Sequence, residues 1–142
     1  MREKASVATA VFLGGILVWI IAMSALSLLA NGWLYHIRQP LPVTEVTASS
    51  VTVLFDRYSR CSMNGRCATE LVCDLVHTYP ARDCVIESGR ARWEERFDLP
   101  GYVDGGSCRL VGLVSYAPLG EFGPRLSHEW KSEAFRIPEG GR

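Results

Sequence analysis

A long apolar segment near the N-terminus constrains this chain more than any other feature. From Ala5 to Tyr35 it contains no Asp, Glu, Lys or Arg, and the nearest charges are Lys4 and Arg38. At about 1.5 Å of rise per residue, a helix of this length exceeds the roughly 30 Å hydrocarbon core of a bilayer. The sequence therefore predicts a cytoplasmic stub at residues 1–4 and a transmembrane helix, acting as a signal anchor, at residues 5–35.

A cleaved signal peptide is the main alternative for this segment. The basic start fits either case, and Ala30 offers a cleavage point. However, the apolar stretch before Ala30 is far longer than the roughly 7–15 residues of a signal-peptide core, and Leu28 is a poor residue three positions before the cut. Trp33 and Tyr35 also suit the headgroup layer at the end of a span. We expect an uncleaved helix, and cleavage would instead release a secreted β domain.

Charge and cysteine usage predict which side the rest of the chain faces. Arg2 and Lys4 precede the span, whereas Arg38 is the only Lys or Arg between the span and Arg57. The positive-inside tendency therefore places the N-terminus in the cytoplasm. All five cysteines follow the span, at a density typical of oxidising compartments. The predicted location is the membrane, with one pass and a periplasmic or extracellular C-terminal domain.

The rest of the chain shows the patterns of an all-β domain. Pro40 and Pro42 cannot continue a helix, so residues 36–42 are predicted to be a linker. Apolar residues then alternate with polar ones between Gly, Pro and Asn turns, which is typical of short strands. The predicted strands lie near residues 44–48, 50–58, 68–77, 84–88, 90–97, 107–116 and 131–137. We expect a small antiparallel β-sandwich over residues 43–138 and a flexible tail at 139–142, although residues 91–97 could alternatively form a helical turn.

The C-terminal part resembles the last hairpin of a fibronectin type III or related immunoglobulin-like domain. The resemblance is carried by the run Cys108–Tyr116, a Gly/Pro loop, and the run Trp130–Ile137. It covers about a third of the chain and implies a two-sheet sandwich, a fold that serves many functions. The layout of one span and a small sandwich is also similar to small single-pass membrane proteins of phages and bacteria.

The cysteine spacing favours disulfides. No Cys-x-x-Cys is present, which disfavours a thiol oxidoreductase. The predicted pairs are Cys61 with Cys67, across a turn at Asn64-Gly65, and Cys84 with Cys108, between strands. They leave Cys73 as a buried free thiol or as the partner in an intermolecular bridge. A zinc site drawing on these cysteines and His77 is a disfavoured alternative, because the usual paired knuckles are absent.

The sequence shows no motif that indicates nucleic-acid binding or catalysis. Fifteen Lys or Arg balance fifteen Asp or Glu, so no basic surface indicates nucleic-acid binding. Neither a Gly-x-Ser-x-Gly turn nor a phosphate-binding loop is present. Glu94 and Glu95 would face opposite sides of a strand, and His77 and His128 are expected at the surface. We therefore predict no catalytic residues, no cofactor and no metal.

Two segments are candidate interaction surfaces. In the span, Ser6, Ala10 and Gly14 recur every four residues and could form a helix-packing face of a homo-oligomer. The loop after residue 117 is long, and its apolar residues either cap the sandwich or present a binding patch. These residues are Leu119, Phe122, Leu126 and Trp130. The sequence thus favours a membrane-anchored binding or assembly module with a protein partner; a phage envelope or lysis accessory is the alternative, and an enzyme comes third.

Overall fold

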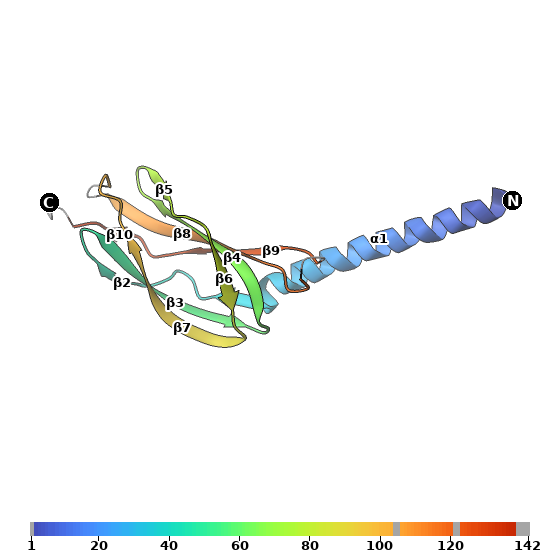
Figure 1. Cartoon of the computed structure of the whole chain (residues 1–142), viewed down its shortest axis with the longest axis horizontal. Helices are drawn as coiled ribbons and strands as arrows, with labels where there is room; N and C mark the ends of the chain where they lie inside the picture. Colours follow the sequence, from blue (N-terminus) through green and yellow to red (C-terminus); the bar gives the residue numbers. More distant parts are fainter. Residues whose placement is uncertain (1, 104–105, 121–122, 139–142) are drawn as a thin grey trace.

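The chain forms one long helix followed by a β domain. The computed structural model describes residues 2–103, 106–120 and 123–138. Helix α1, Arg2–Trp33, projects away from the β domain (Figure 1). Its stretch Thr9–Leu28 is long and apolar enough to cross a membrane, a property that a signal sequence shares. Val11 and Phe12 are each 70% exposed, so the described part of the protein does not cover this helix.

The first sheet is built around strand β3. Its four strands are β1 (Tyr35–Ile37), β2 (Val43–Val46), β3 (Ser50–Ser59) and β7 (Gly89–Asp98). Strand β7 pairs with β3 over ten residues, from Ser50 with Asp98 to Ser59 with Gly89. Strands β1 and β2 also pair with β3, and every strand pair is antiparallel.

The second sheet is built around the pair β4 and β8. Its six strands are β4 (Met63–Val72), β5 (Val76–Thr78), β6 (Arg82–Ile86), β8 (Ser107–Tyr116), β9 (Leu126–Lys131) and β10 (Phe135–Arg136). Strands β5 and β6 pair with β4, and β9 and β10 pair with β8. The chain crosses between the sheets after β3, after β6 and after β7. The predicted antiparallel all-β architecture behind an apolar N-terminal helix is therefore confirmed.

One hydrophobic core lies between the sheets, and it follows from the period of two. Val51, Val53 and Phe55 of β3 are at most 4% exposed, as are Leu110 and Val114 of β8. Residues between them are more exposed, because successive side chains of a strand point to opposite faces. The alternation seen in the sequence therefore marks the core side of both central strands.

The predicted boundary between anchor, linker and domain is wrong. Helix α1 ends at Trp33, and Tyr35 is 2% exposed in strand β1 rather than lying in the span. The predicted linker is part of the fold: Ile37 is buried, and Leu41 is completely buried and forms a parallel bridge with Ser132. Leu41 donates its N–H to the Lys131 carbonyl at 2.9 Å. The domain thus begins directly after the helix.

One predicted turn and one predicted strand also need correction. Asn64 and Gly65, expected in a turn, lie inside β4, where they pair with Val85 and Cys84. Gly65 fits there because a Cβ would lie 3.0 Å from the Ser115 carbonyl oxygen. The strand predicted at 68–77 divides into β4 and β5 with a turn between them. Residues 91–97 lie within β7, so the strand prediction is right and the helical alternative is wrong.

Candidate functional site

The structure pairs the cysteines differently from the prediction. The disulfides are Cys67–Cys84 and Cys73–Cys108, with Cα separations of 6.1 and 4.3 Å. Cys67 and Cys84 lie diagonally across β4 and β6, where Cys67 pairs with Arg82. Cys73 follows Val72, whose partner on β8 is Arg109, so Cys73 faces Cys108. The predicted Cys61–Cys67 bridge depended on a turn at Asn64-Gly65 that does not form. The predicted Cys84–Cys108 bridge between strands is also wrong, because Cys84 lies on β6 and Cys108 on β8, and both of these strands pair with β4 instead of with each other.

Cys61, not Cys73, is the free cysteine. It lies in the turn between β3 and β4 and packs against the core. Within the described ranges, no group of three His, Cys, Asp or Glu residues could hold a metal ion. The disulfides therefore account for four cysteines and leave one thiol near the helix.

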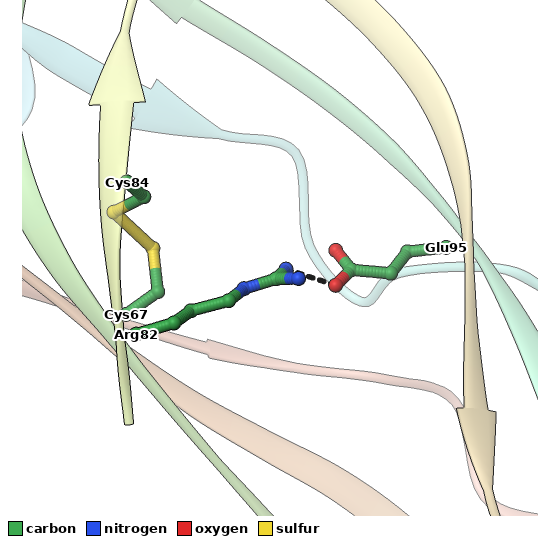
Figure 2. A network of polar contacts seen from close by, with 4 residues as sticks. All are labelled: Cys67, Arg82, Cys84 and Glu95. Atoms are coloured by element: carbon green, nitrogen blue, oxygen red, sulfur yellow. Dashed lines mark hydrogen bonds and ion pairs between the residues drawn. A yellow bond between two sulfur atoms is a disulfide. The ribbon is translucent and has the colours of Figure 1, made fainter. Parts of the chain in front are cut away.

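A cleft opens between the two sheets where β6 lies opposite β7. Its volume is about 210 Å³. Arg82 of β6 forms an ion pair across the opening with Glu95 of β7, beside the Cys67–Cys84 disulfide (Figure 2). Glu95 thus points into the cleft while its neighbour Glu94 is exposed on the opposite face, as the strand argument predicts.

A cation and aromatic rings fill the inner part of this cleft. Arg57 is 8% exposed, and its Nη1 donates to the Glu87 carbonyl at 2.9 Å. Its guanidinium lies 5.5 Å from the centre of the Trp93 ring, and that ring stacks on Phe55 at 5.0 Å. Buried charge paired in this way closes the edge of the core. The groups in the cleft are engaged with one another, so we assign it a structural role.

An exposed apolar patch lies on the hairpin of β4 and β5, toward the end of the domain opposite the helix (Figure 1), and on the loop after β7. We call Leu75, Val76 and Tyr102 the distal tip; they are 65%, 60% and 58% exposed. His77 Nδ1 and the Tyr102 hydroxyl are 2.6 Å apart, which holds the loop after β7 against the hairpin of β4 and β5. The Cys73–Cys108 disulfide fastens the base of that hairpin to β8. Exposed apolar groups on a braced scaffold are typical of a protein-binding surface.

Tyr79 ties the distal tip to both sheets. Its hydroxyl donates to the Asp98 carbonyl at the end of β7, at 2.8 Å, and its ring packs against Phe97 at 5.7 Å. Burial raises the pKa of Tyr79 to about 12, and the nearby Asp98 carboxylate and Tyr102 contribute in the same direction. Tyr79 is therefore a neutral hydrogen-bond donor in the physiological range.

The opposite end of the domain is joined tightly to α1. Arg60 Nε donates to the Trp33 carbonyl at 2.9 Å, and its guanidinium lies 4.3 Å from the centre of the Trp33 ring. The Arg60 N–H also donates to the Leu34 carbonyl at 2.9 Å. Beside this joint lies an apolar groove of about 480 Å³ between the helix and the loop from β8 to β9. We call it the junction groove.

The predicted binding loop divides into two parts. Leu126 and Trp130 belong to β9 and are 4% and 3% exposed, so they complete the core. Leu119 is 59% exposed and lines the junction groove. Phe122 lies outside the described residues.

The other predicted surface residues have mixed outcomes. Ala10 and Gly14 are exposed on α1, and the side chain of Ser6 lies outside the described residues. Self-association through that face stays a prediction. His77 is partly buried at the distal tip, and His128 packs against the Tyr35 ring at 5.6 Å instead of lying free at the surface.

Sequence reasoning missed the distal tip. Leu75 and Val76 were interpreted as the end of one alternating strand, a pattern that places every second apolar residue in the core. The signal that could have found them is Asp74 between Cys73 and Leu75, where the chain turns. Tyr102 gave no such signal, because its position depends on the distant His77.

Comparison with known proteins does not place the chain in a family. No family model matches it, and no curated protein matches it. Among solved structures, a β-glucosidase from Kluyveromyces marxianus in complex with glucose aligns at 12% identity and a TM-score of 0.32. The alignment covers 68% of this chain and 14% of that protein. A structural similarity this weak supports no conclusion about the fold or the activity of this chain.

Proposed function

We propose that this protein is a single-pass, membrane-anchored binding module that presents its distal tip to a protein partner outside the cytoplasm. The observation that carries the proposal is the position of the tip. Leu75, Val76 and Tyr102 are exposed at the end of the domain opposite the helix. A rigid joint at Arg60 and Trp33 holds that end away from the membrane.

The orientation of the domain follows from its cysteines and charges. Two disulfides are expected to persist in an oxidising compartment and not in a reducing cytosol. Together with the positive-inside bias of Arg2 and Lys4, they support a cytoplasmic N-terminus. The β domain then lies in the periplasm or outside the cell, according to the host.

The strand order supports an immunoglobulin-like sandwich of the fibronectin type III kind. One sheet contains β1, β2, β3 and β7, and the other contains β4, β5, β6, β8, β9 and β10. Crossings between the sheets after β3, β6 and β7 match the Greek-key connections of such domains. Because these sandwiches serve many functions, the function is argued from the tip and not from the fold.

A non-enzymatic function agrees with the chemistry of the described surface. The polar groups of the intersheet cleft are engaged in the Arg82–Glu95 pair and in the Arg57 contacts. The distal tip instead offers aliphatic and aromatic area, with one phenol and one imidazole already bonded to each other. Such a surface suits a partner with a complementary apolar patch.

The anchoring is tested by expressing the full chain with a C-terminal tag and fractionating the cells. We expect full-length protein in the membrane fraction, and loss of the tag when protease is added to intact spheroplasts. A soluble product shortened by about thirty residues would show a cleaved signal peptide and contradict the anchor. A tag that resists external protease would contradict the orientation.

The binding surface is tested by placing a photo-crosslinking amino acid at Leu75 in cells. We expect a discrete protein adduct from Leu75 and none from Leu113, a matched leucine that is 44% exposed on the outer face of β8. Leu75→Asp should abolish capture of the same partner by the purified protein, since a carboxylate in an apolar contact is costly. Equal adducts from both positions, or capture unchanged by Leu75→Asp, would contradict the distal tip as the binding surface.

A further inference from the structure

The junction groove lies where the predicted span meets the β domain. One wall is formed by Leu26, Ser27 and Trp33 of α1 and by Leu34 directly after it. The other wall comes from the turn at Cys61, the loop from β8 to β9 and the start of β9. Of the lining side chains, only Ser27, Trp33 and Cys61 carry a polar group. A volume of about 480 Å³ lies within the range of small-molecule binding sites.

The depth of the groove follows from the length of the span. Thr9–Leu28 contains 20 residues, which at about 1.5 Å each correspond to the roughly 30 Å hydrocarbon core. Leu26 and Ser27 lie near the end of that stretch, and Trp33 lies about 7.5 Å beyond Leu28 along the axis, where an indole suits the headgroup layer. Because Leu119 lines the same groove, the loop that carries it lies alongside the last turn of the span.

The loop is shaped to expose an apolar side chain at this depth. Gly120 has a φ of +76°, a conformation that favours glycine, and its N–H donates to the Ala117 carbonyl at 3.2 Å. Leu119 lies within this turn, directly before Gly120, and is 59% exposed. Exposure of such a side chain to water, beside an open apolar groove, is unfavourable. Exposure of the same side chain to the hydrocarbon of a lipid leaflet carries no such cost.

We propose that the junction groove binds a phospholipid of the outer leaflet, with an acyl chain between Leu26 and Leu119 and the phosphate at Arg60. This inference rests on the proposed membrane anchor. The groove is continuous with the lipid-facing surface of the span, because Leu26 contributes to both. Arg60 is exposed and stacks on Trp33, so its guanidinium lies at headgroup depth, where it can pair with a phosphate.

The chemistry of the groove favours a lipid over the other occupants. Water would find few polar partners along these walls, and a polar site is needed to hold it. A second copy of the chain would have to bring an apolar segment to the same depth, in competition with acyl chains that already surround the helix. Phospholipid already surrounds a helix that spans the membrane, so no additional molecule has to be supplied to fill the groove.

The test uses the full chain reconstituted in phosphatidylcholine and phosphatidylglycerol vesicles that contain a phosphatidylcholine with a photoreactive acyl chain. After illumination, adducts are mapped by proteolysis and mass spectrometry. We expect adducts in two places, on the span and on the peptides that contain Cys61 and Leu119. The span adducts report insertion, and the second set reports occupancy of the groove.

Two leucine variants separate this inference from the proposed function. Leu119→Asp should reduce the groove adducts about tenfold, because a carboxylate is poorly tolerated beside an acyl chain. Leu75→Asp, at the distal tip, should leave the groove adducts unchanged while it abolishes partner capture. Both leucines are exposed, so both variants are expected to fold, and intact disulfides confirm it.

The outcomes distinguish the two proposals. Protein that fails to insert and shows no span adducts would contradict the anchor itself. Adducts confined to the span of inserted wild-type protein would overturn the lipid site while leaving the anchor in place. Groove adducts that persist in Leu119→Asp would also overturn it, and so would efficient Cys61–Cys61 dimers under mild oxidation, which would place a second copy in the groove.

Discussion

Arg60 binds Trp33 in two ways at once: its Nε donates to the Trp33 carbonyl at 2.9 Å, and its guanidinium lies 4.3 Å from the centre of the indole ring. The carbonyl belongs to the last residue of α1, where no further helical N–H is available. The Arg60 side chain therefore caps the helix and fastens the β domain to it. This contact fixes the direction in which the β domain extends from the helix.

Replacing Arg60 by Ala should loosen that joint. The loss of the hydrogen bond and of the cation–π contact is expected to cost about 1–2 kcal/mol locally. The amide of residue 60, which donates to the Leu34 carbonyl, should then exchange its hydrogen about tenfold faster. Arg109→Ala, an exposed arginine on β8, serves as the control, and equal exchange in the two variants would contradict the capping role.

The two disulfides should contribute unequally to stability. The Cys73–Cys108 bridge closes 35 residues and Cys67–Cys84 closes 17. The chain-entropy relation gives about 4 kcal/mol for the first and about 3 kcal/mol for the second. We expect the Cys73→Ala/Cys108→Ala variant to show the lower urea midpoint.

Peptide mapping without reduction should alkylate Cys61 alone, and any Cys61-containing disulfide within the chain would contradict the observed pairing.

The buried Tyr116 and the half-buried Tyr79 should respond oppositely to loss of the hydroxyl. Among the described residues, the buried Tyr116 hydroxyl has no hydrogen-bond partner, whereas the Tyr79 hydroxyl donates to the Asp98 carbonyl. Tyr116→Phe should therefore leave stability unchanged or raise it by about 1 kcal/mol, and Tyr79→Phe should lower it by about 1 kcal/mol. Urea unfolding of both variants tests this, and a clear loss of stability in Tyr116→Phe would show that its hydroxyl is satisfied.

Gly112 should not tolerate a side chain. A Cβ at this position in β8 would lie 2.1 Å from the ring of Trp130, which covers it. Gly112→Ala is expected to destabilise the domain by about 1–3 kcal/mol, because the packed ring must move. Gly101→Ala, where nothing lies within 4 Å of the added atom, should change stability little. Similar unfolding midpoints for the two variants would contradict this packing.

Stability should fall at high pH because of Tyr35. Burial raises the pKa of Tyr35 to about 12, with Arg57 opposing and Tyr116 adding to the shift. The unfolded phenol ionises near pH 10, so above that pH the unfolded state binds fewer protons and stability declines until about pH 12. Tyr35→Phe should remove about 1.3 kcal/mol of the decline between pH 9 and pH 11. The free energy of unfolding at pH 9 and pH 11 checks it, and an unchanged pH dependence would show that Tyr35 is not the responsible group.

The parts of the fold that could be predicted are those with a strong local period. The apolar helix follows from its length and its lack of charge. Strands β3 and β8 follow from residue spacing, because each has one consistently buried face. For the β7 segment the sequence predicts a strand, with a helical turn as the alternative. Strand β1 could not be predicted from the local sequence, because Tyr35 and Ile37 resemble the end of an apolar span. Their strand conformation depends on pairing with β3.

The disulfides and the candidate sites depended on contacts distant in sequence. Cys73 and Cys108 meet only because β4 and β8 pair in one register. A shift of one residue would have turned the side chains to the other face. The distal tip likewise requires Tyr102 to meet His77, and the junction groove requires Leu119 to return beside Leu26. No local sequence pattern predicts these long-range contacts.

The immediate passage from helix to strand has a mechanical consequence. Tyr35 follows α1 after a single residue, and its strand pairs with the far end of β3 through Tyr35–Ser59, His36–Tyr58 and Ile37–Arg57. Hydrogen bonds in an antiparallel pair run across the strands, so a pull on α1 along β1 loads these three residue pairs together in shear. In the proposed anchored state, tension between the membrane and a partner would act on all three pairs at once.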